Sequence, residues 1–139
     1  MTKPLVSHVG IAVKDLKKSI EVYSLLTGDH SPVIETVDSD DIEVAIFSGS
    51  NKESGRVELV AATSEKSPLA KFINNRGEGL HHICIYVDDI KSKLKELKNA
   101  GVKLIDETHR VGAEGKKIAF VHPAGLNGVL IELEERERD

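Results

Sequence analysis

The sequence contains little of several residue types, and each shortage excludes a class of protein. Its single cysteine, Cys84, excludes an intramolecular disulfide, and no apolar run approaches the roughly 18 residues of a membrane span. Lys and Arg number 19 against 23 Asp and Glu, so the formal net charge is -4 and the basic excess typical of nucleic-acid binding is missing. The first residues also lack the apolar core of a secretory signal. We therefore expect a cytoplasmic protein without nucleic-acid or membrane partners.

The chain does contain an internal repeat. The ten residues that begin at His8 and the ten that begin at His82, 74 residues later, are identical at five positions. The same offset relates Glu58 to Glu132. Because self-similarity at a fixed offset indicates a duplicated structural unit, we expect one domain built from two similar modules. Module one covers about 5–62, a linker helix covers about 67–76, and module two covers about 79–134.

Each copy of the repeat predicts the element order βαβββ. Aliphatic residues at every second position over 5–13 and 82–87 are typical of a half-buried strand. Asp15 and Asp89 are then expected to be the N-caps of helices with one apolar face. Three more strands are predicted in each copy, near 32–37, 42–48 and 56–62, and near 103–106, 117–122 and 128–134. The prediction is an α+β fold of two βαβββ modules in tandem. The closing run at 134–139 has charges of both signs and is expected to be a solvated tail.

The repeat pairs two residue types that bind metals. His8 corresponds to His82 and Glu58 to Glu132, and a mixed imidazole and carboxylate set accepts Co, Mn, Ni, Fe or Zn. Because side chains alternate along a strand, His81 and His82 lie on opposite faces. The repeat aligns His82 with His8, so His82 is selected as the ligand. A histidine at a strand start and a glutamate near a strand end are otherwise common solvated residues. The shared register is therefore what predicts a divalent metal site.

These features resemble the vicinal oxygen chelate superfamily over about residues 6–134. The resemblance rests on the stretches at 7–13 and 77–85 and on His122-Pro123 followed by the stretch at 128–133. In that superfamily, paired βαβββ modules form a cupped mixed sheet around a divalent metal. Within it the chain most resembles the methylmalonyl-CoA epimerases, many of which have glutamine where this sequence has Glu58. The resemblance implies that His8, Glu58, His82 and Glu132 are the metal ligands.

The resemblance also implies a reaction. The expected function is metal-dependent epimerisation of (2R)- and (2S)-methylmalonyl-CoA by abstraction of the C2 proton through a metal-stabilised enolate. Glu132 would act as a base as well as a ligand. A second base is expected on the third strand of module one, where the register places Val44. Glu43 would serve if a bulge, or a one-residue shift in the acidic loop at 38–41, turned it inward.

The expected partners are an acyl-CoA substrate and a second copy of the chain in a homodimer. Lys116 and Lys117 are candidates for binding the coenzyme A phosphates because of their charge and their predicted position near the mouth of the cavity. On an exposed turn, lysines more often serve solubility.

Two other functions remain open. A glyoxalase I-like lyase acting on a glutathione hemithioacetal would suit the set of two histidines and two glutamates. The turn at 122–128 argues against it, since glyoxalase I tends to have Asp-Pro-x-Gly there. A non-catalytic small-molecule binding module of the resistance type shares the fold but usually lacks the metal ligands.

Overall fold

The computed structural model describes residues 3–137, which separate into two compact units. The first unit is His8–His81, and the second comprises the residues up to Ser7 together with those from His82 onward. The segment that leads into His8 therefore belongs to the second unit. Between residues 3 and 137, none of the helices is both long and apolar enough to cross a lipid bilayer.

The first unit follows the predicted βαβββ order. Its elements are β1 (Val6–Ala12, of which His8–Ala12 lie in this unit), α1 (Leu16–Thr27), β2 (Val33–Val37), a 3-10 turn η1 (Asp38–Asp40), β3 (Ile42–Phe47), β4 (Arg56–Ala62) and α2 (Pro68–Arg76). The strand order is β2-β3-β4-β1, with β1 parallel to β4 and the other neighbours antiparallel. Helix α2 begins where the sequence predicts, because the Ser67 side chain accepts a hydrogen bond from the Leu69 backbone and Pro68 occupies the first turn.

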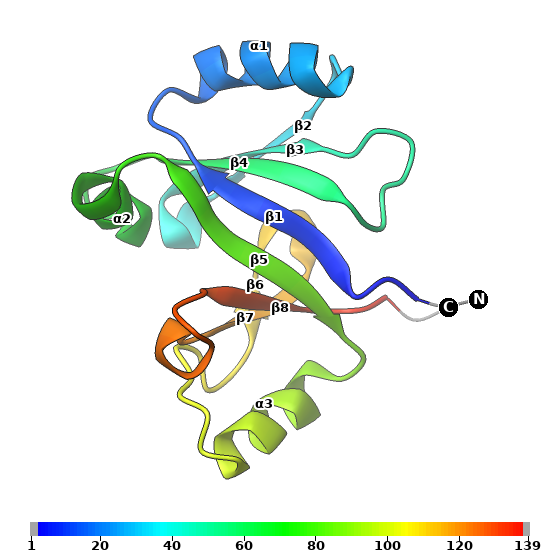
Figure 1. Cartoon of the computed structure of the whole chain (residues 1–139), viewed down its shortest axis with the longest axis vertical. Helices are drawn as coiled ribbons and strands as arrows, with labels where there is room; N and C mark the ends of the chain where they lie inside the picture. Colours follow the sequence, from blue (N-terminus) through cyan, green and yellow to red (C-terminus); the bar gives the residue numbers. More distant parts are fainter. Residues whose placement is uncertain (1–2, 138–139) are drawn as a thin grey trace. The chain divides into compact units, whose positions relative to one another are not determined.

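The sheet of the first unit has two chemically different faces. Helix α1 packs on one of them, as Figure 1 shows, and the buried apolar side chains of that layer are Val13, Leu16, Ala45, Phe47, Leu59 and Ala61. Asp15 caps the helix by accepting a hydrogen bond from the Lys18 backbone at 3.0 Å. Since side chains alternate along a strand, His8 and Glu58 lie on the other face.

The second unit repeats this topology. Its elements are β5 (Gly79–Val87, which enters the unit at His82), α3 (Ile90–Asn99), β6 (Arg110–Val111), η2 (Ala113–Gly115), β7 (Lys117–Val121), η3 (Pro123–Gly125) and β8 (Ile131–Glu135). The strand order is β5-β8-β7-β6, with β5 parallel to β8. Each strand thus takes the place of its counterpart 74 residues earlier, and the α+β class with two βαβββ modules is confirmed.

Helix α3 covers one face of the second sheet. The buried side chains between them are Val87, Ile90, Leu94, Ala119, Val121 and Leu133. Asp89 caps α3 by accepting a hydrogen bond from the Ser92 backbone at 3.0 Å. His82 and Glu132 lie on the face opposite the helix, because they alternate with the core residues along β5 and β8.

The predicted strand at 103–106 is wrong. That segment forms a single bridge, from Leu104 to Val121, and the strand that pairs with β7 is Arg110–Val111. The side chain of Asp106 explains the difference, since its Oδ2 accepts a hydrogen bond from the Phe120 backbone N–H at 2.8 Å. This side-chain contact takes the place of a backbone ladder bond.

The predicted solvated tail is also wrong for most of its described part. Glu134 is 4% exposed, Glu135 accepts a hydrogen bond from the Ile90 backbone N–H at 3.1 Å, and Arg136 donates to the Pro4 carbonyl at 2.7 Å. Arg138 and Asp139 lie outside the described residues. A run of mixed charges in the sequence does not show whether its side chains are solvated or form hydrogen bonds to the backbone of other segments.

Candidate metal centre

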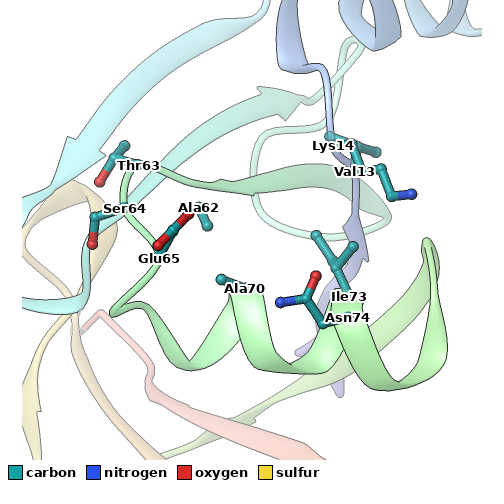
Figure 2. A pocket seen from close by; sticks show the side chains of 9 residues that line it. All are labelled: Val13, Lys14, Ala62, Thr63, Ser64, Glu65, Ala70, Ile73 and Asn74. Carbon is teal, nitrogen blue, oxygen red and sulfur yellow. The ribbon is translucent and has the colours of Figure 1, made fainter.

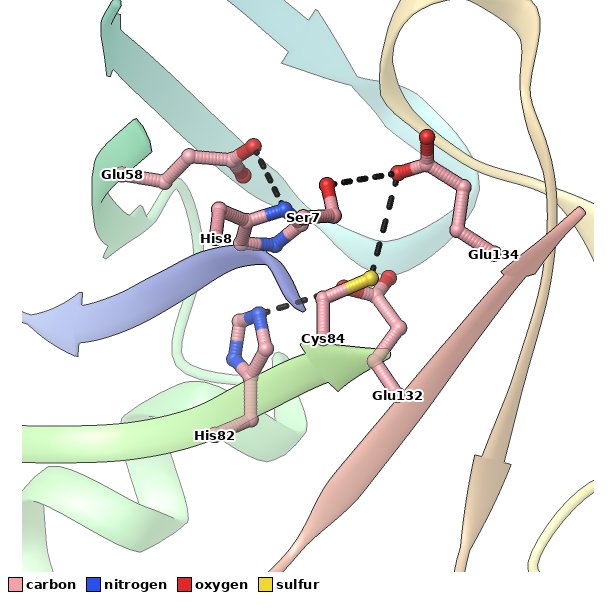
Figure 3. Close-up of polar contacts among 7 residues, drawn as sticks. All are labelled: Ser7, His8, Glu58, His82, Cys84, Glu132 and Glu134. Atoms are coloured by element: carbon pink, nitrogen blue, oxygen red, sulfur yellow. Dashed lines mark hydrogen bonds and ion pairs between the residues drawn. The ribbon is translucent and has the colours of Figure 1, made fainter. Parts of the chain in front are cut away.

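The first unit brings His8 and Glu58 together. His8 comes from β1 and Glu58 from β4, and their side chains are only 4% and 8% exposed. The parallel register aligns Glu58 with Gly10, so no intervening side chain separates the glutamate from the imidazole two residues earlier. The Nδ1 atom of His8 lies 3.1 Å from Oε2 of Glu58 (Figure 3).

The second unit repeats this pair. His82 of β5 and Glu132 of β8 have side chains that are 6% and 10% exposed, with Nε2 of His82 lying 3.2 Å from Oε1 of Glu132 (Figure 3). The ring of Phe120 meets the His82 ring edge to face, with centroids 5.8 Å apart. Because Phe120 is the register partner of Glu132, this aromatic contact packs the imidazole beside the carboxylate.

The donor set within each unit suits a small divalent cation. Two neighbouring ligands at about 2.1 Å from one ion are separated by about 3 Å, which matches the nitrogen-to-oxygen distances of both pairs. Carboxylates are seldom buried unless they are paired or bound to a metal. An imidazole and a carboxylate buried together are therefore a pair of metal-binding groups, and each unit has one such pair.

A third buried carboxylate was not predicted from the sequence. Glu134 lies on the same face of β8 as Glu132 and accepts hydrogen bonds from Ser7 Oγ at 3.4 Å and from Cys84 Sγ at 3.8 Å (Figure 3). Its counterpart 74 residues earlier is Val60, so the repeat gave no signal for it. Strand alternation does give one, because Glu134 is two residues from Glu132 and shares its face.

The structure places Glu43 away from the pair formed by His8 and Glu58. Strand β3 pairs with β4 without a bulge from Ile42 to Phe47, and Glu43 is opposite Ala61 on the face that α1 covers. Val44 lies on the other face and is 2% exposed. The bulge that would have turned Glu43 toward Glu58 is absent from this strand.

Both lysines predicted to bind phosphate have carboxylate partners. Lys116 pairs with Glu137, and this contact lowers the pKa of the Glu137 carboxyl, first through the hydrogen bond and then through the charge. The Nζ atom of Lys117 lies 3.6 Å from Glu135, and Lys117 begins β7 on the face that α3 covers. The second lysine is thus on the opposite face from His82 and Glu132.

A cavity in the first unit lies apart from the predicted ligands. It has a volume of about 710 Å³ and lies beside α2, beyond the ends of β1 and β4 (Figure 2). Its lining residues are Val13, Lys14, Ala62, Thr63, Ser64, Glu65, Ala70, Ile73 and Asn74. The side chains in this lining are of mixed polarity, and no residue predicted as a ligand or base is among them.

The fold agrees with the comparison to known families. Residues 7–120 match the Glyoxalase/Bleomycin resistance protein/Dioxygenase superfamily, and the chain belongs to this superfamily.

Similar proteins within the superfamily include a mitochondrial methylmalonyl-CoA epimerase of Dictyostelium discoideum. It is 39% identical over 132 residues, which cover 94% of this chain and 77% of that protein. The crystal structure of a methylmalonyl-CoA epimerase from Mycobacterium tuberculosis is 34% identical with a TM-score of 0.85, covering 99% of this chain and 93% of the other. A variant of the Streptomyces coelicolor epimerase, in complex with 2-nitronate-propionyl-CoA, is 28% identical with a TM-score of 0.86 and coverages of 96% and 95%.

Proposed function

We propose that this chain is a metal-dependent isomerase that interconverts (2R)- and (2S)-methylmalonyl-CoA. The observation that carries the proposal is the pair of buried imidazole and carboxylate contacts at repeat-related positions, His8 with Glu58 and His82 with Glu132. The similarity to epimerases over nearly the whole chain supports the choice of substrate.

The proposed ligands and the proposed base come from the same set of buried residues. His8, Glu58, His82 and Glu132 would hold one divalent cation, for which Co, Mn, Ni, Fe and Zn are all suitable. When bound, that cation supplies a Lewis acid that makes the C2 proton of the thioester easier to remove. The Glu132 carboxylate would take the proton from one face of C2, and a water molecule on the opposite face would return a proton to give the other epimer. Glu43 receives no role, because it lies on the face covered by α1.

The substrate is proposed to be an acyl-CoA. The S. coelicolor protein of the same fold is in complex with a propionyl-CoA derivative, which supports a coenzyme A ester over a glutathione adduct. Lys116 remains a proposed phosphate contact, and it would have to exchange its partner Glu137 for the phosphate. Lys117 is less suited to this role, because it lies on the α3 side of its sheet.

The test is proton NMR in deuterium oxide with methylmalonyl-CoA and Co²⁺, following exchange of the C2 proton. We expect exchange with the wild type and its loss in His82→Ala. The matched control is His81→Ala, since the adjacent His81 packs against the ring of Phe72 with centroids 4.7 Å apart.

The result that would contradict the proposal is absence of exchange together with thioester formation from a glutathione hemithioacetal. That combination would assign the glyoxalase I-like reaction to the same ligands. If the protein is purified without bound metal and catalyses neither reaction, the result would favour the non-catalytic binding module.

We also propose that the chain forms a homodimer. Leu25 and Leu26 on α1 are 79% and 75% exposed, and a neighbouring apolar pair on a monomer surface favours contact with another protein. Equilibrium sedimentation of the wild type and of the Leu25→Lys, Leu26→Lys double variant tests this. A monomeric wild type, or a dimer that the double variant leaves intact, would contradict the proposed interface.

A further inference from the structure

The buried Glu134 has no part in the proposed reaction, yet its partners are next to the proposed ligands. Ser7 immediately precedes His8, and Cys84 follows His82 by two residues on the same strand face. Both partners are fully buried, and Glu134 is 4% exposed. Burying a carboxylate costs free energy unless hydrogen bonds or an opposite charge compensate for the lost solvation, so the contacts of Glu134 matter.

The segment that precedes His8 is held by the second unit at three successive points. The Pro4 carbonyl accepts a hydrogen bond from Arg136 Nη1 at 2.7 Å, the Leu5 carbonyl accepts one from the Tyr86 backbone N–H at 2.9 Å, and Ser7 Oγ donates to Glu134 at 3.4 Å. Arg136 in turn lies over the Tyr86 ring, 5.0 Å from its centroid. Of these three contacts, the one at Ser7 is nearest to His8.

We propose that Glu134 is a positioning residue for the metal centre. By accepting hydrogen bonds from Ser7 and Cys84, its carboxylate fixes the backbone immediately before His8 and the part of β5 that carries His82. Groups that hold the ligands of a metal commonly alter its affinity by about 10- to 100-fold. This inference rests on the proposed function, since it requires both histidines to bind one ion.

The experiment is a Co²⁺ titration followed by visible absorption, because the d–d bands report the coordination geometry as well as occupancy. The variants are Ser7→Ala, Glu134→Ala and Glu134→Gln. The matched control is Ser67→Ala, which removes an equally buried hydroxyl from the cap of α2 in the first unit. Thermal unfolding of each protein without metal separates loss of stability from loss of ligand geometry.

We expect Ser7→Ala and Glu134→Ala to bind Co²⁺ about tenfold more weakly, with shifted or weakened d–d bands. Glu134→Gln should recover most of the affinity, because its amide oxygen can still accept both hydrogen bonds. Ser67→Ala should lower the melting temperature and leave the Co²⁺ dissociation constant and spectrum unchanged.

Wild-type affinity and spectrum in Ser7→Ala would overturn the inference, and this variant decides the matter if Glu134→Ala fails to fold. A Glu134→Gln protein no better than Glu134→Ala would also overturn it, because the negative charge rather than the hydrogen bonds would then be what matters. A wild type that binds no Co²⁺ would instead refute the metal centre itself.

Discussion

Glu58 is the proposed ligand at which the family resemblance implies glutamine in many epimerases. Its carboxylate lies 3.1 Å from His8 and is buried, so its negative charge would add to the attraction for a cation at that point. We predict that Glu58→Gln raises the Co²⁺ dissociation constant about tenfold while still allowing exchange of the C2 proton. Isothermal titration calorimetry of the variant beside wild type measures the first effect, and proton NMR measures the second.

Glu21→Gln is the control for this change, since Glu21 is an exposed residue of α1. An unchanged dissociation constant in Glu58→Gln would show that this carboxylate does not contact the ion.

The neighbouring positions Glu43 and Val44 make a second prediction at the scale of single residues. Because Glu43 lies opposite Ala61 on the α1 side of its sheet, Glu43→Gln should keep the C2 exchange rate within about twofold of wild type. Glu132→Gln should lower that rate at least about 100-fold, as expected for loss of a general base. The NMR exchange assay measures both, and a large loss in Glu43→Gln would mean that β3 changes register in the working enzyme.

These residues also show what could be predicted from the sequence about the site. The repeat selects two histidines and two glutamates as candidate ligands, and the structure brings each histidine to the glutamate of its own unit. That the four groups bind one ion stays a prediction. The orientation of Glu43 could not be predicted, because it depends on whether one strand contains a bulge, and spacing does not reveal a bulge. Glu134 was missed because it begins the closing run of mixed charge, which was interpreted as a solvated tail, although strand alternation places it on the face of Glu132.

At the scale of elements, the loop after α1 is tied to the end of β3 by a single carboxylate. Asp29 accepts hydrogen bonds from the backbone N–H groups of Ser31 at 3.0 Å and Ser48 at 3.2 Å. Together with the Gly49 backbone and the nearby His30, these contacts hold the pKa of Asp29 below its ordinary value, even though partial burial opposes them. The carboxylate form is therefore bound more favourably in the folded chain than in the unfolded one.

We predict that Asp29→Asn lowers the melting temperature at pH 7. A folded-state pKa below the unfolded one gives stability that is present above the unfolded pKa, near pH 4, and is lost as the pH falls through the folded pKa. The difference between wild type and variant should thus shrink below about pH 4. Calorimetry between pH 3 and pH 8 tests this, and a difference that stays constant with pH would contradict it.

Most elements could be predicted because local signals and the repeat agreed. Cap residues such as Asp15, Asp89 and Ser67 and alternating apolar residues placed the three helices and most strands within a few residues of their observed bounds. The strand before β7 could not be placed, because the Asp106 side chain takes a backbone partner there. The closing run was misjudged for a similar reason, since its charged groups hold backbone atoms of the segment before His8 and of α3.

At the scale of the whole molecule, the duplication gives each unit one imidazole and one carboxylate. If each pair bound its own ion, two ions would be taken up per chain, and loss of one histidine would leave one of them in place. If both pairs ligate one ion, as we propose, a chain binds a single ion and either histidine is required for it. Stoichiometry therefore separates the two arrangements.

We predict one Co²⁺ per chain by metal analysis after dialysis, and its removal by EDTA with loss of C2 exchange. Since a ligand that binds only the folded chain stabilises it, metal at about 100 times its dissociation constant should add about 2.7 kcal/mol and raise the melting temperature. His8→Ala in the first unit and His82→Ala in the second should each abolish the whole increase. Two ions per chain, or half of the increase retained in either variant, would instead mean that the repeat built two separate sites.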